Sequence, residues 1–150
     1  MSGIFSMVLI FLPFLLTSLW VWNGYHQIEQ VDQQVVQSVR AAALAGASDQ
    51  SQTVQYNAQG EGAISYVINQ ATAAQGVDQT FDQNPLRVPG LTTTPPVVSF
   101  PNATTVQVTE DATYRIPDVY EALATFYGVT NQQGVLPIRV TEEASIKPSS

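Results

Sequence analysis

An almost unbroken apolar run opens the chain. Within residues 4–22 only Ser6, Thr17 and Ser18 carry a polar side chain. At about 1.5 Å per residue, a helix of this length spans ~28 Å, close to the ~30 Å hydrocarbon thickness of a bilayer. Pro13 removes a backbone donor, which predicts a kink or local unwinding over the turn before it. The run therefore predicts a helix that is apolar on all sides.

Three interpretations of this run compete. A cleaved secretory signal needs basic residues before its apolar part, and residues 1–3 have none. A buried helix would have to be enclosed by the remaining ~120 residues, which is difficult for a helix that is apolar all round. The third interpretation, which we favour, is a segment held in a bilayer or packed among copies of itself. Trp20, Trp22 and Tyr25 would then form an aromatic belt at the interface.

Beyond Tyr25 the pattern becomes periodic. Apolar residues recur every three or four positions and predict one face of an amphipathic helix, made of Ile28, Val31, Val35, Val39 and Ala42, with Val36 and Ala43 beside them. Neither Pro nor Gly interrupts residues 25–45, so we expect one continuous helix to about Gly46. Apart from Leu44, residues 41–47 are small, which fits either close packing against another element or a helix end capped by Gly46.

The rest of the chain predicts a small α+β head. We expect a loop over residues 48–62, a short helix over 63–74 ended by Gly76, and an irregular segment over 78–96 in which residues 92–94 are a connector. Strands are predicted near 97–100, 105–109 and 136–146, with Pro137 favouring an edge. A short helix or loop follows Asp118 and stops at Gly128. This divides the chain into an N-terminal helix, residues 1–46, and a head of about three antiparallel strands and a second helix, residues 47–150.

The composition narrows the possible functions. The chain has 12 Asp and Glu against 5 Lys and Arg, a net charge of −7, one His and no Cys. An acidic, Lys-poor chain lacks the positive surface that nucleic acids require. Without Cys there is no disulfide, thiolate metal site or cysteine nucleophile. The sequence contains neither of the glycine-rich nucleotide-binding motifs, G-x-x-x-x-G-K-[ST] and G-x-G-x-x-G. No serine lies in a G-x-S-x-G motif. We therefore expect no enzyme activity, no cofactor and no metal site.

Few polar residues remain as candidates for chemistry. Glu110–Asp111 and Glu142–Glu143 are adjacent pairs whose side chains point to opposite faces of a strand, so we interpret them as solvated charges. His26 is expected to be a hydrogen-bonding residue beside the aromatic belt. Asn102-Ala103-Thr104 matches the N-glycosylation pattern, which makes Asn102 a possible glycosylation site.

The order of these parts resembles the type IV pilin superfamily. The shared features are an uncharged apolar helix, an Ala-rich amphipathic continuation and a small β-containing head. Within the superfamily the chain looks most like the TadE-like pilins and pseudopilins of tight-adherence systems. The residues that carry this resemblance are Val106-x-Val108, Tyr114-x-Ile116-Pro117, Leu123, Phe126 and Ile138-x-Val140-x-x-Glu143-Ala144. This segment is similar to the TadE layout of a strand, a Pro-containing apolar stretch and a closing strand.

The resemblance implies a structural subunit of an extracellular adhesive pilus. The subunit would sit in the cell membrane, meet the pilus assembly machinery, and then polymerise with copies of itself into a helical filament. Two alternatives stay open: a membrane-anchored minor pilin or accessory protein outside the main filament, and a single-pass tethered binding domain. The predicted assembly residues are Ile4, Phe5, Val8, Leu9, Phe11, Leu12, Pro13, Phe14, Leu15, Leu16, Leu19, Trp20, Val21, Ile28, Val31, Val35 and Val39.

Overall fold

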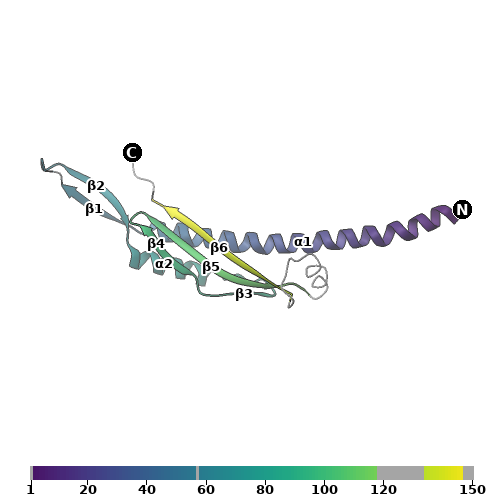
Figure 1. The fold of residues 1–150 in the computed structure, drawn as a ribbon. Helices are drawn as coiled ribbons and strands as arrows, with labels where there is room; N and C mark the ends of the chain where they lie inside the picture. Colours follow the sequence, from purple (N-terminus) through teal and green to yellow (C-terminus); the bar gives the residue numbers. More distant parts are fainter. Residues whose placement is uncertain (1, 57, 118–133, 147–150) are drawn as a thin grey trace.

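The fold was obtained as a computed structural model, which describes residues 2–56, 58–117 and 134–146, and within them the side chains of all but 2–6, 8, 9, 55 and 63. Its elements follow in the order α1 Ser2–Ser48, β1 Gln50–Tyr56, β2 Gly62–Ile68, α2 Gln70–Gln83, β3 Leu91–Thr93, β4 Val97–Asn102, β5 Thr105–Arg115 and β6 Val135–Ser145 (Figure 1). The predicted α+β class, with one long N-terminal helix, a second helix and antiparallel strands, is confirmed.

Helix α1 is continuous over 47 residues. Its first half extends alone from the head, and its second half lies along the head (Figure 1). The helix passes through Pro13, so the expected local unwinding does not occur. The Thr17 and Ser18 hydroxyls donate to the carbonyls of Pro13 and Phe14 (2.7 and 2.9 Å), four residues earlier. The predicted continuity is confirmed, and the helix ends two residues beyond Gly46.

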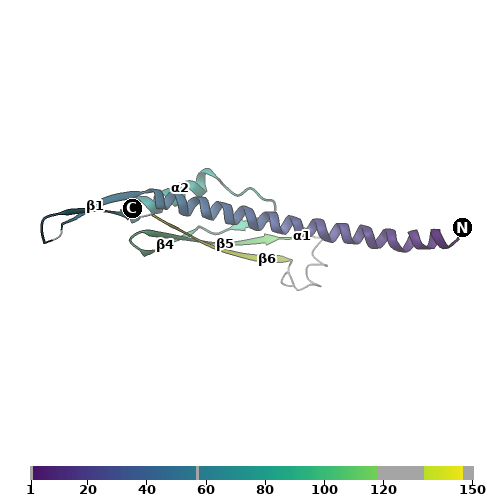
Figure 2. The same ribbon diagram turned by 90° about the horizontal axis from the view of Figure 1, so that it is seen from above.

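The head has two layers, one of strands and one of helices. The second half of α1 lies over β5 and β6, and α2 lies beside it, toward β4 (Figure 2). The predicted apolar face of α1 is confirmed, because Val31, Val35, Val39, Ala42 and Ala43 are at most 5% exposed. Burying these side chains against the sheet and α2 stabilises the head.

Gly46 lies at the closest approach of three elements. A Cβ atom added there would be 3.0 Å from Val77 Cγ2 on α2 and 3.2 Å from Val106 Cγ1 on β5. Of the two interpretations of the small residues at the end of α1, close packing is the one that the structure supports. The helix does not stop at Gly46, so this glycine is not the cap.

Strand β5 is the centre of the main sheet. It pairs antiparallel with β6 along one side, and with β3 and then β4 along the other. Among the described strands β6 therefore lies at an edge, as Pro137 predicted. Alternate residues of β5 face the helices and are buried, namely Val106, Val108, Glu110, Ala112 and Tyr114. The alternation gives the sheet one covered face and one exposed face.

Several predicted elements between residues 48 and 96 are wrong. The expected loop contains β1, and the expected helix over 63–74 begins as β2 and continues as α2, with Gly76 inside that helix. Residues 64, 67 and 68 have helical spacing, but pairing with β1 outweighs this local pattern. Residues 92 and 93 belong to β3, which pairs with β5, so they are not a connector. The described chain has six strands instead of about three, and the helix or loop expected after Asp118 falls outside the described residues.

Candidate assembly surface

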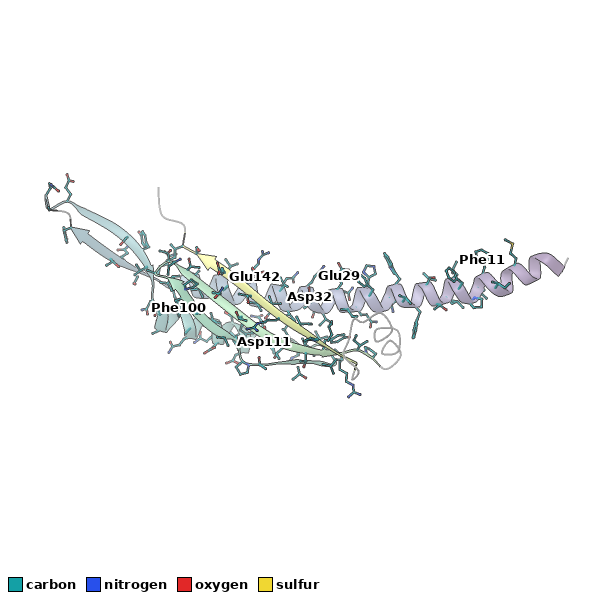
Figure 3. All side chains as sticks on the ribbon, in the orientation of Figure 1. Phe11, Glu29, Asp32, Phe100, Asp111 and Glu142 are labelled. Atoms are coloured by element: carbon teal, nitrogen blue, oxygen red, sulfur yellow. The ribbon has the colours of Figure 1, made fainter. Side chains whose placement is uncertain are left out.

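The exposed surface of α1 from residue 10 to residue 22, here called the apolar stem, is the candidate functional site. Its large apolar side chains are 37–73% exposed, the least exposed being Trp20 and the most exposed Ile10. Phe11 lies well away from the acidic side chains of the head (Figure 3). The exposed set is Ile10, Phe11, Leu12, Phe14, Leu15, Leu16, Leu19, Trp20 and Trp22. Pro13 is exposed as well, and Val21 is half-buried.

Exposure on the apolar stem is not confined to one stripe. Successive residues of an α-helix point about 100° apart, so Ile10, Phe11 and Leu12 already point in widely separated directions. All three are more than half exposed. A helix built to pack on one partner has an apolar stripe and a polar back. The apolar stem has no polar back, and it contains no charged residue.

The predicted assembly residues separate into three groups. Those from Phe11 to Val21 lie on the apolar stem. Ile28, Val31, Val35 and Val39 instead pack in the head, where Ile28 is half-buried and the three valines are at most 5% exposed. Their apolar surface is covered by this chain's own sheet and second helix, so it is not available to another copy. The side chains of Ile4, Phe5, Val8 and Leu9 lie outside the described set.

The junction between the apolar stem and the head carries aromatic and polar side chains. The rings of Trp22 and His26 meet edge to face, with centroids 4.6 Å apart. His26 Nδ1 lies 3.4 Å from Glu29 Oε2, which agrees with its predicted polar role. Glu29 is the first formally charged side chain of the sequence. The change from an uncharged to an acidic surface thus occurs within about two turns of α1.

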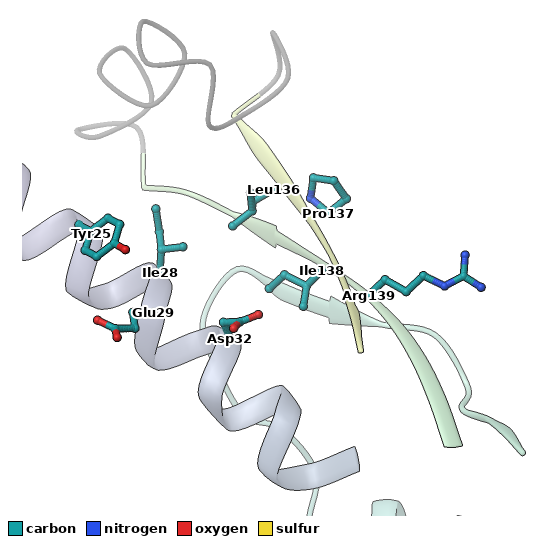
Figure 4. A pocket seen from close by; sticks show the side chains of 8 residues that line it. All are labelled: Tyr25, Ile28, Glu29, Asp32, Leu136, Pro137, Ile138 and Arg139. Atoms are coloured by element: carbon teal, nitrogen blue, oxygen red, sulfur yellow. The ribbon is translucent and has the colours of Figure 1, made fainter. Parts of the chain in front are cut away.

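A cleft of about 430 Å³ lies between α1 and β6, just beyond this junction. Tyr25, Ile28 and Asp32 line it from the helix, and Leu136 and Ile138 line it from the strand (Figure 4). Arg139, at its margin, reaches across to the exposed face of the sheet, where its Nε lies 3.4 Å from Asp111 Oδ1. Among the described residues no three His, Asp or Glu side chains group as metal ligands. The cleft is a mainly apolar recess with one acidic wall.

The two carboxylate pairs separate across the sheet, as the strand geometry predicted. Asp111 and Glu143 are on the exposed face, where Gln107 Nε2 donates to Glu143 Oε1 (2.8 Å). Glu142 is on the helix side, where Arg40 Nε lies 3.6 Å from its Oε2. Glu110 is 1% exposed and its Oε2 has no hydrogen-bond partner, so its interpretation as a solvated charge is wrong. Burial raises the pKa of Glu110 from 4.5 to about 7.

The glycosylation candidate lies in the turn between β4 and β5. Asn102 and Thr104 are exposed, and the Asn102 Oδ1 accepts hydrogen bonds from both the N–H and the hydroxyl of Thr104, each 2.9 Å long. The Ala103 carbonyl between them accepts from the N–H of Ile68 (2.8 Å). The sequence motif therefore coincides with a tight, accessible turn.

The sequence missed two features. The first is the buried carboxyl group of Glu110, which the period-two burial of β5 would have placed on the inner face. The second is an apolar face on the β1–β2 hairpin, where Val54, Tyr56 and Ile64 are 47%, 73% and 60% exposed. Both features follow from the alternation of side chains between the two faces of a strand. The apolar face of the hairpin could not be predicted because strands β1 and β2 were not expected.

Comparisons with protein-family models, curated proteins and solved structures find no match to this chain. Among the residues that the structure describes, no helix is both long and apolar enough to span a membrane.

Proposed function

We propose that this chain is the structural subunit of a helical filament. The apolar stems of neighbouring copies form the filament core, and the acidic heads surround it. The observation that carries the proposal is the apolar stem, an extended helix whose large apolar side chains are uncovered on every side. Such a surface is unstable in water and is stabilised when lipid or copies of the same segment cover it.

The shape of this surface favours many neighbours over one partner. Covering the exposed parts of nine large side chains would contribute roughly 10 kcal/mol, at about 1 kcal/mol for each half-exposed side chain. One partner covers only one side of the helix and gains a fraction of this, against an association cost of about 4–15 kcal/mol. Several neighbours around each apolar stem gain most of it. A repeated, non-closing contact of this kind produces a filament.

The charge distribution favours the N-terminal end of the chain as the part that forms the filament core. All 12 acidic residues lie at position 29 or later, and the chain carries a net charge of −7. Heads packed together in a dry core would bring these carboxylates close, which is costly. Together with the resemblance to TadE-like pilins, this supports an extracellular pilus whose subunits reside in the membrane and meet an assembly machinery before they polymerise.

Assembly of the purified full chain tests the proposal. The chain is purified in mild detergent, the detergent is removed, and the sample is examined by negative-stain electron microscopy. We expect filaments from the unaltered chain and none from Leu15→Glu, because a carboxylate on the apolar stem would be desolvated in the core. Circular dichroism should give the same helix and strand content for both.

Gln34→Glu is the matched control. It adds the same charge to the same helix at an exposed polar position, over the head. We expect this variant to form normal filaments. A chain that stays monomeric after detergent removal, or Leu15→Glu filaments as abundant as those of the unaltered chain, would contradict the proposal.

A further inference from the structure

A two-stranded hairpin projects from the end of the molecule opposite the N-terminus. Strands β1 and β2 extend beyond the C-terminal end of α1 (Figures 1 and 2). They pair antiparallel from Gln50↔Ile68 to Tyr56↔Gly62. The hairpin is attached at its base, where the N–H of Ile68 donates to the Ala103 carbonyl (2.8 Å) and that of Asn69 donates to the Asp49 carbonyl (3.0 Å). Beyond its base it forms a sheet of its own.

The hairpin has one apolar face and one polar face. Val54 pairs directly with Ile64, and Tyr56 pairs with Gly62, on the face that also carries Tyr66. A Cβ atom added to Gly62 would lie 3.2 Å from Tyr56 Cε1 and 3.3 Å from Val54 Cγ1, so both side chains lean over the glycine. The opposite face carries Ser51, Thr53 and Ser65. We call the side with Val54, Tyr56, Ile64 and Tyr66 the hairpin face.

The hairpin face is uncharged, and it is apolar and exposed toward its tip. Nearer the base it also carries Gln52, whose Nε2 donates to the Tyr66 hydroxyl (3.4 Å). Val54, Tyr56 and Ile64 are 47%, 73% and 60% exposed, and Tyr66 is half-buried. An isolated two-stranded hairpin is at best marginally stable in water, and exposed apolar sheet faces of this kind are sites of association. Neither strand contains a charged residue.

We propose that the hairpin face of one copy packs on the apolar stem of another copy in the filament. The inference rests on the proposed function and names a second contact within it. In a bundle of apolar stems, neighbouring helices cover the side of each helix that faces the bundle axis. The side that faces outward must be covered by another apolar surface. The hairpin face is suited to that outer side, because its exposed part is apolar and it carries no charged residue.

Charge and geometry both favour this partner. Copies with a net charge of −7 repel each other wherever acidic surfaces meet, and neither the hairpin face nor the apolar stem contains a charged residue. The two surfaces lie at opposite ends of one elongated molecule (Figure 1). When copies point the same way and are staggered along the axis, the hairpin of one copy lies beside the apolar stem of a copy further along. Such a contact leaves each copy with a free site of each kind, so it propagates without closing.

Cysteine crosslinking tests this contact, because the sequence has no Cys of its own. Full-length chains carrying Phe14→Cys are mixed with chains carrying Ile64→Cys, assembled by detergent removal and treated with a short bis-maleimide. We expect a crosslink between positions 14 and 64 in the mixture, identified by mass spectrometry of the joined peptides, because Phe14→Cys chains can also crosslink to each other in the core. A chain that carries both substitutions should give a ladder of higher oligomers. The matched control is Thr53→Cys mixed with Phe14→Cys, because Thr53 is next to Val54 on the opposite, polar face. The crosslink between positions 14 and 53 should be at least several-fold less abundant than the crosslink between positions 14 and 64.

The outcomes of the crosslinking experiment separate this inference from the proposed function. Filaments without the mixed crosslink overturn this inference and leave the proposed function intact. Dimers formed by Ile64→Cys alone also overturn it, because they place a second hairpin on the hairpin face. Equal crosslinking through Thr53→Cys overturns it as well, since the contact would then not depend on the hairpin face. The absence of filaments together with the absence of crosslinks overturns both the inference and the proposed function.

Discussion

Glu110 is held between the sheet and the helices, where its side chain is 1% exposed and its Oε2 makes no hydrogen bond. Burial raises its pKa to about 7, so the folded chain holds a proton that the unfolded chain releases near pH 4.5. The head is therefore more stable at pH 4 than at pH 8 as far as this group is concerned. Between pH 4 and pH 8, the difference between a pKa of 4.5 unfolded and about 7 folded lowers the free energy of unfolding by about 3 kcal/mol.

Replacing this carboxyl with an amide should remove that pH dependence. We expect Glu110→Gln to unfold like the unaltered chain at pH 4 and to be more stable by up to about 3 kcal/mol at pH 8, because the amide does not ionise. Equilibrium unfolding in urea, in mild detergent, measures this. Glu143→Gln, on the exposed face, is the control and should leave the pH profile unchanged. Parallel profiles for Glu110→Gln and the unaltered chain would show that Glu110 titrates normally.

Gly46 tests the packing of α1 against α2 and β5. A larger side chain there meets Val77 Cγ2 at 3.0 Å and Val106 Cγ1 at 3.2 Å. We expect Gly46→Val to lower the free energy of unfolding by about 1–3 kcal/mol through overpacking. Ala41→Val, at an exposed position of the same helix, should cost only about 0.5 kcal/mol. Equal losses at the two positions would mean that helix propensity, and not crowding, sets the cost.

The two halves of α1 differ in their surroundings. Val35 is fully buried in the head, whereas Leu15 is 54% exposed on the apolar stem. We expect Val35→Ala to lower the free energy of unfolding by about 2 kcal/mol and Leu15→Ala to change it by less than about 0.5 kcal/mol. Urea unfolding in detergent measures both. A large loss from Leu15→Ala would mean that the apolar stem packs on its own head.

The sequence predicted the elements whose pattern is long and regular. The 3.6-residue repeat of Val31, Val35 and Val39 identified the buried face of α1. Alternation identified the central strand β5 and the edge strand β6 beside it. The hairpin was missed because β1 is rich in Gln, Ser and Thr and has no apolar alternation of its own. Helix α2 was misplaced because the spacing of Ile64, Val67 and Ile68 fits a helix locally. Only the pairing of this segment with β1 decides between a helix and a strand.

The candidate site was predictable in part for the same reason. An uninterrupted apolar run needs no partner in the sequence to be recognised, so the residues of the apolar stem could be identified as one apolar group, and their role in assembly stays a prediction. The amphipathic stretch from Ile28 to Val39 is ambiguous, because an apolar stripe fits both a filament core and the core of a head. The fold places it in the head. The adjacent acidic residues Glu110 and Asp111 do not by themselves indicate which of the two side chains is buried.

For the molecule as a whole, assembly into the proposed filament would bring like charges together. Each copy carries a net charge of −7, and the heads are the part that remains in water. Raising the salt concentration from about 0.01 M to about 0.15 M shortens the Debye length from about 30 Å to about 8 Å, which weakens repulsion between heads. We expect the critical concentration for assembly at neutral pH to fall over this range, as measured by sedimentation. Filaments that dissolve as salt rises would instead indicate that ion pairs join the copies.

The continuity of α1 has a mechanical consequence. In the proposed filament, a pulling force would travel along the backbone of each helix, since no loop or joint separates the apolar stem from the half of α1 that lies along the head. Pro13 cannot donate the backbone hydrogen bond that every neighbouring turn contributes. Under load, elongation would begin at that turn, well away from the head.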